Sequence, residues 1–167
     1  MHKSVLLNEC LENLNLKSDS IVVDATLGYG GHSSHILKRI PSGYLYCFDQ
    51  DADAITYSSK RLKEIADNFE IINSNFVNLK NELNDRGVEK VDAILFDLGV
   101  SSPQLDQGER GFSFHNDARL DMRMNKTAKL SAYEVVNEYT EEQLTNIFLK
   151  YGEEKYSRNI AKNMVKY

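Results

Sequence analysis

Residues 21–32 read Ile-Val-Val-Asp-Ala-Thr-Leu-Gly-Tyr-Gly-Gly-His, and this stretch decides the fold. It begins with a short β-branched apolar run, passes an acid at Asp24 and ends in a glycine-rich turn. Such an unbroken apolar run is typical of a buried parallel strand rather than of a half-exposed antiparallel one. The next segment, 32–40, places Ile36, Leu37 and Ile40 at helical spacing. The stretch therefore predicts a strand, a turn and a helix.

Three further apolar runs repeat this plan along the chain. They cover residues 44–48 before Asp49, residues 69–72, and residues 91–96 before Asp97. Segments with helical character precede and separate the runs, at 7–14, at 52–67 and after 76. Strands that alternate with helices indicate a parallel sheet with right-handed crossovers. We therefore expect an α/β fold whose strands end in polar side chains at one edge of the sheet.

The composition and the hydrophobic periodicity of the sequence change after Asp97. Residues 98–130 are rich in Gly, Ser, Asp and Arg without a clear period, which favours a functional loop over a plain connector. Helical patterns return at Ser131, where Ser131–Glu134 and Thr140–Gln143 have the form of capping boxes. A third helix is expected from about Glu153 to the end of the chain.

Composition narrows the class of protein. The chain has 167 residues, of which 41% are hydrophobic and 27% charged, as in one ordinary globular domain. Its net charge of −5 disfavours RNA binding over the whole surface, although cations gather in the last stretch. These are Lys150, Lys155, Arg158, Lys162 and Lys166, against Glu153 and Glu154.

The expected cellular location and metal content depend on three features of the sequence, namely its apolar runs, its cysteines and its histidines. No apolar run approaches the ~20 residues that a membrane span needs. Cys10 and Cys47 form no motif and suit a reducing compartment, so we expect a cytoplasmic protein with no membrane partner. The histidines are scattered, and no metal site is expected; they are His2, His32, His35 and His115.

The glycine-rich turn favours one kind of nucleotide ligand. Position 33 is Ser, so the dinucleotide fingerprint is incomplete, and no Lys-Ser/Thr pair makes a P-loop. An acid at the strand end followed by Gly-x-Gly suits S-adenosyl-L-methionine, which carries an ammonium and a sulfonium. A turn that binds nothing is the alternative. Asp49 could hold ribose hydroxyls or cap the next helix, and Phe76 could stack on a purine or belong to the core.

Several sequence blocks point to a known family. Residues 97–106 read DLGVSSPQLD, residues 109–114 read ERGFSF and residues 120–124 read LDMRM. The start at 2–9, HKSVLLNE, and the YGEE at 151–154 belong to the same set. Together these blocks resemble the signature of the bacterial ribosomal RNA cytidine-N4 methyltransferase family known as RsmH or MraW, along essentially the whole chain.

The resemblance implies a class I, Rossmann-like methyltransferase core with a helical domain inserted after the fourth strand. It implies that residues 1–104 form the core that binds S-adenosyl-L-methionine and that 105–167 form the loop and the start of the insertion. Family members continue well beyond this length and add further strands. The resemblance therefore implies a truncated insertion and an incomplete sheet, which could self-associate through its edge. The implied cofactor residues are Gly30, Gly31, His32, Asp49, Phe76, Asp97 and Gln104.

The implied reaction moves a methyl group to the N4 amine of a cytidine in 16S, small-subunit rRNA, either naked or in the assembled subunit. Asp97 is the candidate catalytic acceptor for the amine proton. Arg110, Phe112, Arg119 and Arg123 are candidate RNA contacts, although a salt-bridged loop is the alternative because nearby acids balance the cations. Two other functions stay open, namely an inactive cofactor-binding fragment and a small-molecule methyltransferase.

Overall fold

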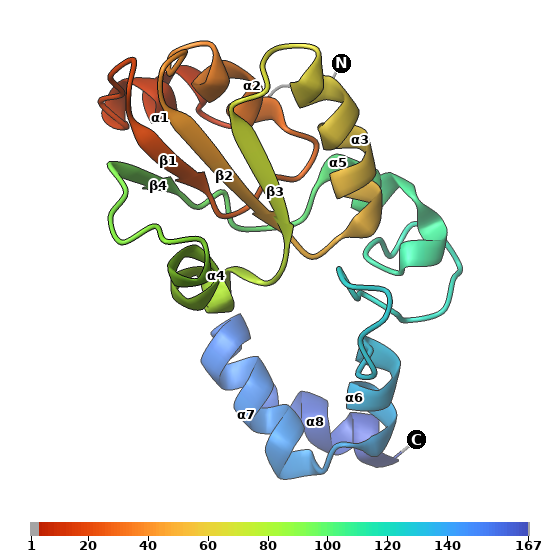
Figure 1. Ribbon diagram of the computed structural model, residues 1–167. Helices are drawn as coiled ribbons and strands as arrows, with labels where there is room; N and C mark the ends of the chain where they lie inside the picture. Colours follow the sequence, from red (N-terminus) through yellow and green to blue (C-terminus); the bar gives the residue numbers. More distant parts are fainter. Residues whose placement is uncertain (1–3, 167) are drawn as a thin grey trace. The chain divides into compact units, whose positions relative to one another are not determined.

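The structure is a computed structural model that describes residues 4–166. The chain divides into two compact units, Met1–Ser101 and Ser102–Tyr167, which we describe separately. The first unit alternates helices and strands (Figure 1). Its elements are α1 (Leu7–Asn13), β1 (Ile21–Asp24), α2 (Gly31–Leu37), β2 (Tyr44–Asp49), α3 (Ala52–Lys63), β3 (Phe69–Asn73), the 3-10 turn η1 (Phe76–Asn78), α4 (Leu79–Asp85) and β4 (Ala93–Leu95).

The four strands form one sheet in the order β3-β2-β1-β4, and every neighbouring pair is parallel. The predicted α/β architecture with a parallel sheet is confirmed. Because the carboxyl ends of parallel strands meet at one edge, Asp24 of β1 and Asp49 of β2 lie at the same edge, as expected from their positions in the sequence.

Side chains alternate between the two faces of the sheet and so build two cores. Val22 and Cys47 face a cluster that includes Leu11 of α1, Ile36 of α2 and Leu62 of α3. The next residues along the two strands, Val23 and Phe48, face a second cluster with Ile72 and Leu83. A strand buried on both faces needs apolar residues at consecutive positions, which explains the unbroken run at 21–23.

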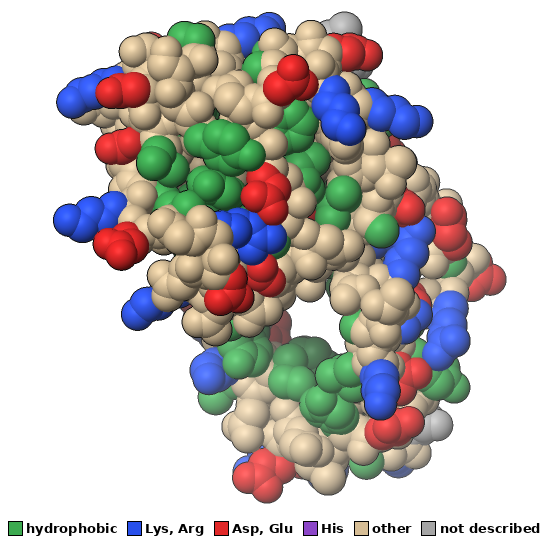
Figure 2. Space-filling model, in the orientation of Figure 1, with side chains coloured by type: hydrophobic (Ala, Val, Ile, Leu, Met, Phe, Trp, Pro, Cys, Tyr) green, Lys and Arg blue, Asp and Glu red, His purple; other side chains and the backbone are tan. Residues whose placement is uncertain are grey.

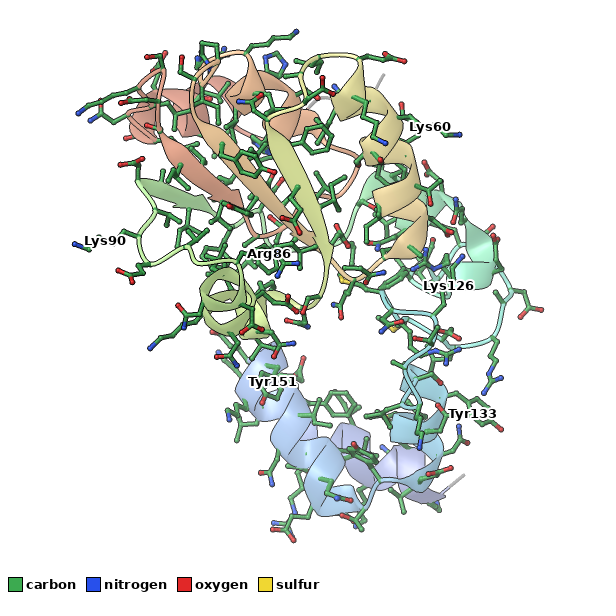
Figure 3. All side chains as sticks on the ribbon, viewed as in Figure 1. Lys60, Arg86, Lys90, Lys126, Tyr133 and Tyr151 are labelled. Carbon is green, nitrogen blue, oxygen red and sulfur yellow. The ribbon has the colours of Figure 1, made fainter. Side chains whose placement is uncertain are left out.

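Helix α4 covers the second face only in part. Arg86, at the end of α4, is bound to Glu70 of β3 at 2.8 Å and to Glu82 at 2.9 Å (Figure 3). Ile94 of β4 pairs with Val23 and remains 41% exposed. Figure 2 shows apolar side chains gathered over the strands beside α4. The predicted self-association through the sheet stays a prediction.

Strand β4 is shorter than expected, at 93–95 instead of 91–96. Side-chain hydrogen bonds add to the backbone bonds at both of its ends. The Asp92 carboxylate accepts the Ile21 N–H at 2.7 Å, and the Asp97 N–H donates to the Thr26 hydroxyl at 2.7 Å. The expected helices at 32–40 and 52–67 likewise end early, at Leu37 and Lys63.

The second unit is a loop with two short turns followed by three helices. Its elements are α5 (Ser102–Asp106), the 3-10 turn η2 (Gly108–Arg110), α6 (Ala132–Glu138), α7 (Glu141–Gly152) and α8 (Ser157–Lys166). The predicted domain boundary after residue 104 falls within α5, and the assignment of this unit to a helical insertion stays a prediction.

Both predicted capping boxes are present at the starts of α6 and α7. The last helix, by contrast, begins at Ser157 and not near Glu153. Glu153 adopts a left-handed conformation with φ 50°, and the Glu154 N–H donates to the Phe148 carbonyl at 3.1 Å. This pattern closes a helix, so the expected start was wrong because these residues end α7.

Candidate functional site

The glycine-rich turn between β1 and α2 has a backbone that only glycine adopts readily. Gly28 has φ 49° and Gly30, the N-cap of α2, has φ 73°. Helix α3 holds the turn from one side. The Ser58 hydroxyl donates to the Gly28 carbonyl at 2.6 Å, and the Arg61 guanidinium donates to the Tyr29 carbonyl at 3.1 Å. The turn is therefore fixed by side chains from another element before any ligand binds.

The Asp49 carboxylate accepts one backbone N–H from the same turn and one from the N-cap of α3. One carboxylate oxygen accepts the Gly28 N–H at 2.7 Å and the other accepts the Asp51 N–H at 2.8 Å. Burial raises the pKa of Asp49, while these two hydrogen bonds oppose the rise. The alternative cap role falls to Asp51, whose side chain accepts the Asp53 N–H at the start of α3. Each Asp49 oxygen retains accepting capacity for a hydroxyl.

Asp24 lies beneath the turn and not on its surface. Its side chain is 1% exposed and accepts the Ser33 hydroxyl at 2.6 Å and the Thr26 N–H at 3.1 Å. Burial raises the pKa of Asp24 against these two hydrogen bonds. Ser33, which breaks the dinucleotide fingerprint, thus supplies the hydroxyl that satisfies the buried acid. Asp24 braces the turn.

His32 joins three segments of the first unit. The ring is buried, with Nε2 at 3.0 Å from the Val5 carbonyl oxygen and Nδ1 at 3.5 Å from an Asp97 carboxylate oxygen. Asp97 itself is 44% exposed. A Cβ at Gly31 would lie 2.0 Å from the Ser4 hydroxyl, so a larger residue there would require the Ser4 side chain to move. The structure therefore places Gly31 and His32 under residues 4–5.

Two aromatic rings stand beyond the third and fourth strands. Phe76 opens η1, and its ring meets that of Phe96 edge-on, with centroids 5.6 Å apart and planes at 88°. The two side chains are 40% and 48% exposed. Exposure of two large rings at one edge of a sheet suits a flat apolar ligand. The core alternative for Phe76 does not fit this exposure.

The first unit thus brings six of the predicted cofactor residues to the carboxyl edge of one sheet. They are Gly30, Gly31, His32, Asp49, Phe76 and Asp97. Gln104 lies in α5 of the second unit, where it is buried. Sequence reasoning missed Val5, Ser58, Arg61 and Phe96, whose partners lie 20 to 32 positions away in the chain.

In the second unit, two of the four candidate RNA residues bind within their own loop. Arg110 is 4% exposed and donates to the Arg123 carbonyl at 3.0 Å. The Arg123 guanidinium holds the Asp121 carboxylate through two bonds, at 2.9 and 2.6 Å. The Arg123–Asp121 pair corresponds to the salt-bridged loop that was the alternative, whereas Arg110 bonds a backbone carbonyl of the same loop.

Phe112 and Arg119 keep more access to solvent. Phe112 is partly exposed and lies under the Arg110 guanidinium, 5.9 Å from it. The Arg119 side chain is 61% exposed and bonds Glu134 at 3.1 Å above the Tyr133 ring on α6 (Figure 3). RNA binding stays a prediction for all four residues.

The Asp121–Arg123 pair predicts an acid-sensitive loop. The Arg123 guanidinium lowers the pKa of Asp121 from 3.8 to about 2. A carboxyl with a depressed folded pKa stabilises the fold above its unfolded pKa, and this stability is lost as the pH falls through the folded value. Hydrogen exchange of the Ala132 N–H, which donates to the Asp121 carbonyl, should therefore accelerate between pH 3.8 and about 2.

Asp121→Asn should remove most of this acid dependence, whereas Asp117→Asn, at an exposed acid of the same loop, should keep it. The same pH profile in both variants would contradict the role of the pair.

Two kinds of feature are absent from residues 4–166. No three His, Cys, Asp or Glu side chains gather as a metal would require. No helix there combines the length and apolar character of a membrane span.

Comparison with known proteins matches the chain to one family. The model of the MraW methylase family matches residues 1–167. A ribosomal RNA small subunit methyltransferase H from Exiguobacterium sibiricum is 56% identical over 165 residues, covering 99% of this chain and 53% of that protein. The protein of the same name from Mycoplasmopsis synoviae is 55% identical over 164 residues, covering 98% and 54%. The chain spans about half the length of these curated relatives.

A solved structure supports the fold. A Clostridium thermocellum protein provisionally assigned as an rRNA methylase superposes with a TM-score of 0.50 at 23% identity, over 62% of this chain and 58% of that one. With the full-length family match and identities above 50%, the chain belongs to the MraW methylase family.

Proposed function

We propose that the chain binds S-adenosyl-L-methionine at the carboxyl edge of the first unit and takes part in methyl transfer to the N4 amine of a cytidine in 16S rRNA. The observation that carries the proposal is the preformed edge of the sheet. A glycine turn held by α3, a carboxylate at the end of β2 and two exposed rings lie along it. The family match and the names of the relatives support rRNA as the substrate and methyl transfer as the reaction.

The residues at this edge fit the proposed cofactor. Asp49 would hold ribose hydroxyls through its remaining lone pairs, and Phe76 with Phe96 would flank the adenine. Gly30 has φ 73°, a conformation that strains a residue with a side chain, and a Cβ there would contact Ser58 at 3.4 Å. When bound, the cofactor would supply an electrophilic methyl group on a sulfonium. The cofactor role of Gln104, which lies in the second unit, stays a prediction.

Asp97 would act on the nucleophile. The exocyclic amine of cytosine is weakly nucleophilic because its lone pair is delocalised into the ring. A carboxylate that accepts a hydrogen bond from this amine raises its electron density and later removes a proton. The Asp97 side chain is 44% exposed, so its carboxylate can reach a substrate. Holding the amine in line with the departing sulfur would provide much of the remaining acceleration.

For RNA, Arg119 is the strongest of the four candidates because its guanidinium remains largely exposed. Phe112 would offer a ring to a base. Arg110 and Arg123 would contribute by shaping the loop that carries them.

The first test is cofactor binding by the chain itself. A thermal melt with S-adenosyl-L-methionine at about 100 times its Kd should show about 2.7 kcal/mol of added stability. For a domain of this size the midpoint should rise by roughly 5–10 °C. ATP is the control ligand, because the turn lacks the Lys-Ser/Thr pair that a P-loop uses for phosphates. A melt that neither ligand moves would overturn the cofactor site.

The second test identifies the product. The chain is incubated with methyl-labelled cofactor and either naked small-subunit rRNA or assembled small subunits, and the RNA is digested to nucleosides. We expect label in N4-methylcytidine alone. Label in another nucleoside, or on small molecules without RNA, would replace the proposed substrate. Cofactor binding without label in any RNA would favour the inactive cofactor-binding fragment.

A further inference from the structure

The His32 ring lies between two hydrogen-bond acceptors. Nε2 faces the Val5 carbonyl oxygen at 3.0 Å, and a carbonyl can only accept, so Nε2 carries a hydrogen. In the neutral ring Nδ1 is then the basic nitrogen, and it faces an Asp97 carboxylate oxygen at 3.5 Å. A proton that arrives between these two atoms would be shared by a basic nitrogen and a carboxylate. His32 and Asp97 together thus form a place for one proton.

Of the two side chains in this pair, Asp97 is the one that is open to solvent. His32 is 6% exposed, whereas the Asp97 side chain is 44% exposed, so solvent and substrate reach the pair through Asp97. Among residues 4–166, Asp24 below the turn and His35 one turn along α2 also interact electrostatically with His32. Asp24 is engaged by Ser33 and Thr26, which leaves Asp97 as the carboxylate in contact with Nδ1.

We propose that His32 is a positioning residue for methyl transfer, which takes up at Nδ1 the proton that Asp97 removes from the reacting amine. This inference rests on the proposed function. In the transfer, the amine nitrogen forms a bond to the methyl carbon as the carbon–sulfur bond breaks, and the sulfur keeps that electron pair. The nitrogen gains the positive charge that the sulfur loses. One N–H proton then passes to Asp97 and on to His32 Nδ1, which forms an imidazolium–carboxylate pair.

The Val5 carbonyl has a defined part in this arrangement. It fixes which nitrogen is basic, as the orienting partner of a catalytic histidine does in other enzymes. The N-terminal segment therefore sets the direction of the ring.

The test uses two substitutions of one side chain. His32→Gln keeps an amide N–H near the position of Nε2 and can retain the bond to Val5, but it has no basic nitrogen. His32→Asn is too short to reach Val5. If His32 only supports the fold, Gln should restore what Asn loses. If it takes the proton, Gln should keep the melting temperature and the KM for rRNA while kcat falls by roughly 10²-fold. This loss should shrink as the pH rises, because solvent then removes the proton from Asp97.

A spectroscopic measurement decides the placement of the proton without any reaction. Nitrogen-15 NMR of histidine-labelled chain should show His32 as a single Nε2–H tautomer at high pH, while the exposed His115 serves as the internal reference. An Nδ1–H tautomer would overturn the inference.

The two proposals fail differently. If the unmodified chain labels no RNA, the proposed function fails, and the histidine spectra alone decide the placement of the proton. If the chain is active and His32→Gln has normal kcat at every pH, the role of His32 fails while the methyltransferase function stands.

Discussion

Replacing Asp97 with alanine should lower the rate of methyl transfer by about 10²–10⁴-fold, the usual contribution of a positioned proton acceptor. The sheet should survive, because the hydrogen bond of Asp97 to the neighbouring segment comes from its backbone, although alanine also loses the 3.5 Å contact with His32 Nδ1. The Asp97 N–H donates to the Thr26 hydroxyl at 2.7 Å, and any residue except proline keeps that bond. Label incorporation into rRNA at saturating cofactor would measure the loss, and a thermal melt would confirm that the sheet is intact.

A matched control is Asp85→Ala, which removes an exposed carboxylate at the end of α4. It should leave the rate unchanged. If Asp97→Ala methylates normally, Asp97 does not accept the amine proton and its role is limited to cofactor contact. If Asp97→Ala instead loses cofactor binding while its turnover at saturation is normal, the same conclusion holds.

Gly111→Ala should destabilise the loop of the second unit by about 2–3 kcal/mol, one of the larger effects open to a single methyl group. Gly111 has φ 70°, and a Cβ there would lie 2.5 Å from the Arg119 carbonyl oxygen and 2.6 Å from the Asp121 nitrogen. Both are backbone atoms, so no side chain can rotate away. Hydrogen exchange of the Met122 N–H, which donates to the Arg110 carbonyl, should accelerate accordingly.

Gly87→Ala separates the two causes of this effect. Gly87 has φ 72°, nearly the same conformation, and nothing lies within 4 Å of the position that a Cβ would take there. This variant should cost only the conformational penalty, about 1 kcal/mol. Equal costs at the two glycines would show that the loop yields and that residues 111 and 119–121 are not tightly packed.

Periodicity and strand-end chemistry predicted the first unit well. The apolar pairs Val22–Val23 and Cys47–Phe48 serve both faces of a parallel sheet, and this is why unbroken runs identified the strands. Strand and helix ends were less predictable. Strand β4 ends where the Asp92 and Thr26 side chains add hydrogen bonds, and the sequence pattern of 91–96 does not show that these side chains meet Ile21 and Asp97.

The candidate site could be predicted where its residues follow strands and not where they meet through space. Asp49 and Asp97 follow apolar runs, so their edge of the sheet was clear. The contact of Val5 with His32 and that of Phe96 with Phe76 depend on how separate segments return to one place. Glu153 shows the same limit locally, because a glutamate in a left-handed conformation ends α7 where composition favoured a helix start.

Residues of β2 and α3 both hold the glycine turn, so the number of residues that separates them along the chain determines whether they can reach it. Asp49 holds an N–H of the turn, while Ser58 and Arg61 hold its carbonyls. A residue inserted between 49 and 58 would rotate α3 by about 100° relative to β2 and carry both side chains away from the turn. This segment therefore acts as a spacer whose residue count is set by its contacts with the glycine turn.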